Sequence, residues 1–296
     1  MIVPHSRIGS SLLAVFAVLI TWTMPAARAQ ENKSFPEAKR IVSVGGTVTE
    51  ILYALNAQDR IIAVDATSIH PPQAREKADV GYIRALSPEG IIGQNPDLIL
   101  LQEGSGPPDA ISVLRASGLP VVTIASKPNA QSVSQKIRDV GAAVGLDAQA
   151  SAIADRVGRQ LQAAIAENAN WAAAKKRVLF VLSLANGRVM VGGRDTEPAE
   201  LIRMAGGINA AEQVSGYKPM TDEAIIAAKP DFVLVMETGN HRFTPEQVFD
   251  LPAFKSTPAG ETRALLGMDG LLLTGFGPRT PDAVRLLAAK LYGGSQ

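Results

Sequence analysis

The chain has 296 residues, of which 29 are lysine or arginine, 28 are aspartate or glutamate and 46% are hydrophobic. This composition is typical of a globular protein with about two lobes, and its balanced charge excludes strong attraction to nucleic acid or an anionic membrane surface. The absence of cysteine excludes disulfides, a thiolate nucleophile, cysteine-ligated metal centres and a cysteine-linked lipid anchor.

Residues 1–29 show the three-part pattern of a secretory signal peptide. Arg7 precedes the apolar run Leu12–Ile20, and Ala27-Arg28-Ala29 supplies a small-residue cleavage site. This apolar run is much shorter than the roughly 20 residues that span a bilayer. We expect cleavage before Gln30 and an exported protein with no stable membrane insertion. The alternative is an uncleaved N-terminal anchor.

One segment of the body occurs twice, because residues 86–100 align without a gap on residues 220–234. Each copy predicts a serine or threonine N-cap, an acidic residue in the first helical turn, a short helix ending before proline, and a buried apolar strand. The body is therefore predicted to consist of two similar halves.

Strands alternate with helices throughout both halves. Continuous apolar runs predict strands over residues 40–44, 61–64, 98–101, 121–124, 178–182, 189–191 and 232–235. This alternation predicts an α/β fold with a mainly parallel sheet in each half.

Residues 147–174 are predicted to form one long helix between the halves. They contain few helix breakers, and Ile153, Val157, Leu161 and Ile165 recur at helical spacing. We expect an N-terminal α/β lobe over residues 30–146, this connecting helix, and a C-terminal α/β lobe over 175–296. Because a helix is a stiff connection, a cleft of nearly fixed width is expected between the lobes.

The sequence offers few residues for catalysis or nucleotide binding. Gly45-Gly46 follows a predicted strand, but no third glycine completes a dinucleotide-binding fingerprint. The chain after residue 29 has two histidines, His70 and His241, and no metalloprotease or nucleophile-elbow motif. Loops at the carboxyl ends of parallel strands favour a binding cleft. The alternative class is an enzyme, such as a chelatase or oxidoreductase, with these histidines as its acid–base groups.

Between residues 40 and 280 the sequence resembles the periplasmic haem-binding proteins of ATP-binding-cassette (ABC) haem importers. They belong to a wider class III group of binding proteins that carries ferric siderophores and cobalamin. The most specific stretch is VGYIRALSPEG at 80–90, supported by residues 192–196, 201–211 and 216–219. The resemblance implies two Rossmann-like lobes joined by a rigid helix, and a periplasmic, non-enzymatic carrier. Its cargo would be haem b, with no catalytic cofactor.

The resemblance implies that Tyr82 ligates the haem iron. Phenolate is a hard oxygen ligand that suits ferric iron. In an extended loop Arg84 would point to the same side as Tyr82 and hydrogen-bond the phenolate oxygen. The other interpretation is that Tyr82 and Arg84 are ordinary surface loop residues.

The second lobe is expected to cover the other porphyrin face and to bind the propionates, for which the planar guanidinium of arginine is well suited. Arg242, in the loop after the repeated strand, is the first choice. His241 beside it is either a second axial ligand or an exposed loop residue. Tyr217, one residue from the repeat position of Tyr82, is either a distal-face residue or a packing aromatic. The remaining candidates are Arg188, Arg194, Arg279 and Lys218.

In the wider group, one surface glutamate on each lobe docks into arginine pockets of the two membrane subunits. Glu50 and Glu200 match these places, and each is expected to open a helix, where a carboxylate also complements the helix dipole. The expected partners are haem, an inner-membrane permease dimer with its ATPase subunits, and other haem carriers. We expect a monomer. The alternative cargo is a ferric siderophore or cobalamin, and a siderophore would not need Tyr82, because it already satisfies its metal.

Overall fold

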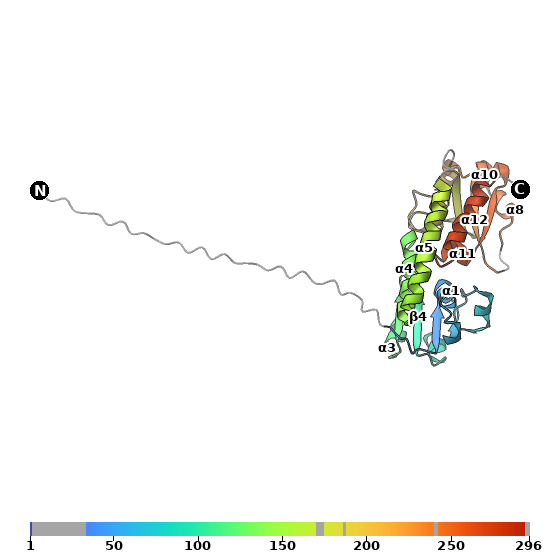
Figure 1. Ribbon diagram of the computed structural model, residues 1–296. Helices are drawn as coiled ribbons and strands as arrows, with labels where there is room; N and C mark the ends of the chain where they lie inside the picture. The colour runs from blue at the N-terminus through green and yellow to red at the C-terminus, as the bar shows by residue number, and fades with distance from the viewer. Residues whose placement is uncertain (2–33, 170–174, 186–187, 240–241, 294–296) are drawn as a thin grey trace. The chain divides into compact units, whose positions relative to one another are not determined.

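The computed structural model describes Met1 and residues 34–169, 175–185, 188–239 and 242–293 (Figure 1). Apart from Met1, the predicted signal peptide lies outside the described residues. Residues 32–296 group into one compact unit. No helix within the described ranges combines the length and the hydropathy needed to cross a bilayer.

The first sheet is fully parallel and contains five strands in the order β3-β2-β1-β4-β5. Its strands are β1 (Ile41–Val44), β2 (Ile61–Val64), β3 (Ala78–Asp79), β4 (Leu98–Gln102) and β5 (Val121–Ile124). The chain leaves β1 toward β2 on one side and later returns to β4 on the other. Such a reversal of strand order is where open α/β sheets bind ligands, at the carboxyl ends of the strands.

The second sheet is mixed, with the order β11-β10-β6-β7-β9 and β8 paired to β6. Its strands are β6 (Arg177–Ala185), β7 (Arg188–Gly192), β8 (Ile208–Asn209), β9 (Tyr217–Met220), β10 (Phe232–Glu237) and β11 (Leu265–Asp269). The pairs β10·β11, β6·β10 and β6·β8 are parallel, whereas β7 is antiparallel to both β6 and β9. The connection from β6 to β7 is too short for a parallel crossover, which needs a dozen or more residues.

The helices alternate with these strands and cover them. The first half has α1 (Gly46–Ala54), α2 (Pro88–Ile92), α3 (Pro108–Ala116) and α4 (Ala130–Ala143), with short 3₁₀ turns at Gln58–Arg60 and Pro72–Glu76. The second half has α6 (Glu197–Met204), α7 (Asp222–Ala228), α8 (Pro245–Phe249), α9 (Pro252–Lys255), α10 (Pro258–Thr262), α11 (Gly270–Thr274) and α12 (Thr280–Tyr292).

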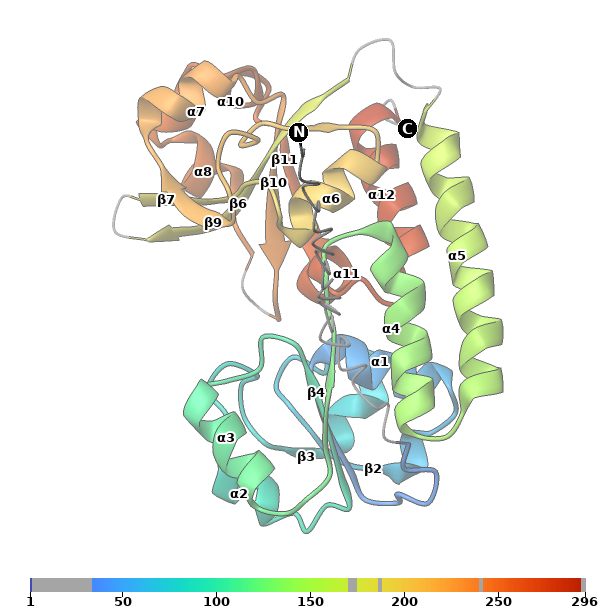
Figure 2. The same cartoon turned by 90° about the vertical axis from the view of Figure 1, so that its left-hand side faces the viewer.

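The predicted long helix is α5 (Asp147–Ala169), and residues 170–174 of the prediction lie outside the described part of the chain. Its 23 residues give a length of about 35 Å. It packs along both α4 and α12 (Figure 2). One cluster of buried hydrophobic side chains runs from the first sheet through these three helices into the second sheet. This shared core makes the connection stiff.

The internal repeat is confirmed as a repeated helix start. Ser87 caps α2 by accepting a hydrogen bond from the Gly90 amide, and Thr221 caps α7 by accepting one from the Ala224 amide. A buried strand follows each helix, β4 in the first half and β10 in the second. The predicted α/β fold is therefore confirmed.

Candidate functional site

Tyr82 lies on a loop that follows β3, the edge strand at one side of the first sheet. Val80, Ile83 and Leu86 anchor this loop with buried side chains, and the Gly106 amide donates a 2.9 Å hydrogen bond to the Ile83 carbonyl oxygen. The Tyr82 side chain is 50% exposed, and Arg84 is exposed on the same loop. The loop therefore presents a phenol and a guanidinium from a fixed backbone.

Tyr217 begins β9 in the second sheet and is the other exposed aromatic side chain of the described residues, at 36%. Its ring packs edge-on against Phe180, with centroids 6.5 Å apart, and its hydroxyl donates a 3.1 Å hydrogen bond to Glu197 Oε2. Burial and the charge of Glu197 raise the pKa of Tyr217, and the positive charge of Arg84 acts against them. Arg84 of the first half is therefore within electrostatic reach of Tyr217 in the second.

A polar contact that we call the interlobe clasp joins the two halves. It consists of Thr47, Glu50 and Lys136 from the first half with Gly275 and Arg279 from the second. The Gly275 carbonyl oxygen accepts hydrogen bonds from Thr47 Oγ1 at 2.8 Å and from Lys136 Nζ at 2.9 Å. Arg279 Nη2 lies 3.0 Å from Glu50 Oε2. Both halves therefore contribute side chains or a carbonyl group to these polar contacts.

Backbone packing beside the clasp is close. A Cβ atom at Gly46, the first residue of α1, would lie 2.9 Å from Leu271 Cδ1 in the second half and would clash with the Thr67 carbonyl oxygen. This position therefore requires glycine, because a side chain would clash with the backbone of the Thr67 loop.

Lys136 is fully buried on α4, and Nζ also donates a 2.8 Å hydrogen bond to Ser126 Oγ. Burial lowers the pKa of Lys136 to about 8, although the carboxylates of Glu197, Glu50 and Glu103 act in the opposite direction. The sequence prediction did not include this residue. Its burial could have been predicted from the sequence, because Lys136 lies on the apolar face of α4 at helical spacing from Val133, Ile137 and Val140.

The prediction that Glu50 is a surface residue opening a helix is wrong. Helix α1 begins at Gly46 and has no acidic residue in its first turn, and the Glu50 side chain is only 8% exposed. It is buried because its position in α1 turns the carboxylate toward Arg279. Arg279, a predicted propionate ligand, is therefore already paired with Glu50 in the clasp.

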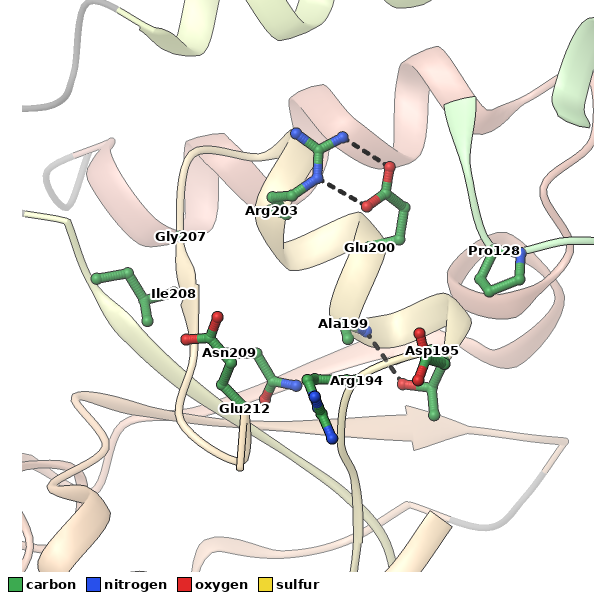
Figure 3. A pocket seen from close by; sticks show the side chains of 11 residues that line it. Pro128, Arg194, Asp195, Ala199, Glu200, Arg203, Gly207, Ile208, Asn209 and Glu212 are labelled. Carbon is green, nitrogen blue, oxygen red and sulfur yellow. Dashed lines mark hydrogen bonds and ion pairs between the residues drawn. The ribbon is translucent and has the colours of Figure 1, made fainter. Parts of the chain in front are cut away.

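Glu200 lies in the first turn of α6, as predicted. Arg203 donates two hydrogen bonds of 2.7 Å to its carboxylate, and this pairing raises the pKa of Arg203. Both residues line a surface hollow of about 400 Å³, shown in Figure 3, that also includes Arg194. A second hollow of about 460 Å³ lies near Tyr53. Tyr82 lines neither of them.

The other predicted side chains of the second half lie on exposed positions. Arg242 is 72% exposed, with Nε 3.7 Å from Glu237 Oε2. Exposed positions are also occupied by Arg188 in β7, by Lys218 next to Tyr217, and by Arg194. His241 lies outside the described residues.

His70, an acid–base candidate for the enzyme alternative, lies near the clasp. Burial and the charge of Arg279 lower the pKa of His70, whereas Glu50 and Asp269 act to raise it. The neutral imidazole is therefore favoured. Within the described ranges, no three His, Asp or Glu side chains gather closely enough to hold a metal ion.

The profile of the periplasmic binding protein family matches residues 41–270. The periplasmic haem-binding protein RhuT from Roseiflexus sp. RS-1, solved in its apo form, is 34% identical, with a TM-score of 0.82 over 88% of this chain and 100% of that one. The periplasmic haem-binding protein BhuT, solved with two haems, is 36% identical, with a TM-score of 0.81 over 86% and 98% of the two chains. The vitamin B12-binding protein of Vibrio cholerae is 24% identical over 69% of this chain and 72% of its own length. The chain therefore belongs to the periplasmic binding protein family, with the class III architecture of substrate-binding proteins of ABC importers.

Proposed function

We propose that this protein is the haem-binding component of an ABC importer, which takes up haem in the periplasm between its two lobes and delivers it to an inner-membrane permease. The observation that carries the proposal is the exposure of Tyr82 on an anchored loop, with Arg84 two residues on and within electrostatic reach of Tyr217 in the other half. The similarity to solved haem-binding proteins, at 34% and 36% identity over most of the chain, supports this cargo.

Tyr82 would supply the axial ligand to the iron. A phenol has an ordinary pKa of about 10, so ligation at neutral pH requires something that favours the anion. The ferric ion of the cargo does most of this, and a hydrogen bond from Arg84 to the phenolate would contribute the rest. The side chain needs no large rearrangement to do so, since it is already half exposed.

The porphyrin faces would contribute affinity through burial, at about 25 cal/mol per Å² of apolar area. The propionates would pair with exposed cations of the second half, with Arg242 as the first choice, and Arg188, Arg194 and Lys218 as the others. Arg242 is 72% exposed and its ionic contact with Glu237 is weak at 3.7 Å, so turning it toward a propionate costs little. Arg279 is a poor choice, because leaving the clasp would strand the buried carboxylate of Glu50. His241 stays a proposed distal ligand.

Docking to the permease is confined to Glu200 in this proposal, because the Glu50 carboxylate is buried. The Glu200 side chain is 15% exposed and already neutralised by Arg203. A permease arginine would therefore have to displace Arg203 or join the pair. The carrier itself makes and breaks no covalent bond, and removal of residues 1–29 on export belongs to the same proposal.

Cobalamin is the second candidate cargo, favoured by the similarity to a vitamin B12-binding protein. Titration of the chain from Gln30 onward distinguishes the candidate cargoes. The ligands are hemin, cyanocobalamin and a ferric hydroxamate siderophore, and each titration is followed by absorption and tryptophan fluorescence. Saturable binding of hemin with a shifted absorption band, and no comparable binding of the other two, is expected. Tight cobalamin or siderophore binding without hemin binding would contradict the proposal.

A further inference from the structure

The hydroxyl of Tyr217 is already engaged in the protein. It donates its proton to Glu197 Oε2 at 3.1 Å, and the ring rests edge-on against Phe180 at an interplanar angle of 69°. Gly192 is the cross-strand partner of Tyr217. A Cβ atom at Gly192 would lie 2.8 Å from Phe180 Cδ1 and 3.4 Å from Tyr217 Cε1, so glycine is what allows the two rings to approach. The position of Tyr217 is therefore specified by three neighbours.

Glu197 has a defined place as well. It is the first residue of α6, after the N-cap Thr196, where a carboxylate is stabilised by the helix dipole. It also lies close enough to the buried Lys136 to be the carboxylate with the largest effect on that group. The charged groups that act on Tyr217 are thus Glu197 on its own half and Arg84 on the opposite one.

The net charge of the haem iron with its ligands determines whether a second phenolate, from Tyr217, would be favourable. Ferric iron in a dianionic porphyrin carries one net positive charge, which a single phenolate neutralises. A second phenolate from Tyr217 would leave an uncompensated negative charge next to Glu197 in a partly buried site, which is unfavourable.

We infer that Glu197 is a positioning residue that holds Tyr217 as a protonated phenol, so that the second half offers the porphyrin an aromatic surface and not a second iron ligand. This inference rests on the proposed haem cargo and assigns a specific role to each half. Tyr82 provides the one anionic ligand, and Tyr217 stays neutral and does not add a second phenolate. This keeps the cargo releasable, because the importer then has one iron–oxygen bond to break.

Three variants test the inference. Tyr217→Phe keeps the ring against Phe180, so its hemin complex is expected to keep the wild-type spectrum, with affinity reduced by no more than about tenfold. Glu197→Gln removes the charge that opposes ionisation of Tyr217, and its hemin complex is expected to gain a second tyrosinate signature in absorption and resonance Raman spectra. The double variant Glu197→Gln with Tyr217→Phe is expected to return to the wild-type spectrum.

Glu223→Gln is the matched control, because Glu223 lies in the first turn of the short helix α7 in the same half and is exposed. Ionisation of the tyrosines, followed by absorption in the apo protein, is a readout that does not need haem, and it is simple to resolve because the chain has only four tyrosines. In Glu197→Gln, Tyr217 is expected to ionise at a lower pH than in the wild type or in Glu223→Gln, although burial still holds its pKa above the ordinary value.

Two results would overturn the inference while leaving the proposed function standing. One is a Glu197→Gln hemin complex with an unchanged spectrum, and the other is loss of the wild-type tyrosinate signature in Tyr217→Phe. Wild-type protein that does not bind hemin overturns the proposed function and this inference with it.

Discussion

Replacing Lys136 with methionine removes the ammonium group that the interlobe clasp buries. In the folded protein the pKa of Lys136 is lowered from 10.5 to about 8. In the unfolded chain it returns to its ordinary value of about 10.4. The cost of burying the charge is therefore fully present below pH 8, and it is relieved as the pH rises toward 10.4.

The free energy of unfolding changes with pH because the folded and unfolded states bind different numbers of protons. Between these pH values the folded protein holds a neutral amine while the unfolded chain still binds the proton, so the free energy of unfolding rises with pH. A difference of between two and three pKa units corresponds to about 3 kcal/mol. At pH 7 the methionine variant also loses the hydrogen bonds to Ser126 Oγ and the Gly275 carbonyl oxygen. The pH dependence, and not the absolute stability, is therefore the informative quantity.

Urea unfolding of the wild type and Lys136→Met at pH 7, 8, 9 and 10 measures this dependence. Subtracting the two curves cancels the other titrating groups, and Lys290→Met, at an exposed position of α12, is the matched control. Wild-type stability relative to Lys136→Met is expected to rise by about 2–3 kcal/mol between pH 7 and pH 10. A difference that stays constant across this range would show that Lys136 is hydrated in solution and that the clasp does not bury it.

Three further predictions concern the clasp, the repeat and docking. Glu50→Gln leaves the partly buried guanidinium of Arg279 without its counter-ion, so it is expected to lower the free energy of unfolding by about 2–3 kcal/mol while hemin affinity is unchanged. Urea unfolding measures this effect, and a loss of less than about 0.5 kcal/mol would contradict the buried pairing. Thr221→Ala removes the N-cap of α7 and is expected to cost about 1 kcal/mol, whereas an unchanged midpoint would show that the cap is not formed. Glu200→Lys is expected to abolish haem-dependent growth of an importer-bearing strain at unchanged hemin affinity, and normal growth would refute the docking role.

The strands and the repeat were largely predictable from local patterns. Strands β2 and β5 have the predicted ends, since continuous apolar runs between turn residues are sufficient to specify buried parallel strands. Strand β9 (YKPM) was missed because it is polar and contains proline, and it exists through antiparallel pairing with β7. Strand β3 was missed because it has only two residues.

The environment of the clasp could not be predicted from local patterns. Glu50 and Arg279 are 229 positions apart, and no periodicity reveals such a pairing. The hydrogen bond between Tyr217 and Glu197 likewise depends on how β9 pairs with β7. Local patterns specify helices, strands and caps, whereas these contacts arise from tertiary packing, between the halves for Glu50 and Arg279 and within the second half for Tyr217 and Glu197. Burial of Lys136 was the exception, because its place on the apolar face of α4 was visible in the sequence.

The role of Tyr82 is tested most directly by hemin titration of Tyr82→Phe, with Tyr217→Phe as the matched variant, since these are the two exposed tyrosines of the described residues. Phenylalanine keeps the ring and removes only the ligating oxygen. Tyr82→Phe is expected to lose the tyrosinate signature and at least tenfold in hemin affinity, while Tyr217→Phe keeps the signature. If Tyr82→Phe instead binds hemin with the wild-type spectrum and affinity, the iron is ligated elsewhere and the proposed binding mode is wrong.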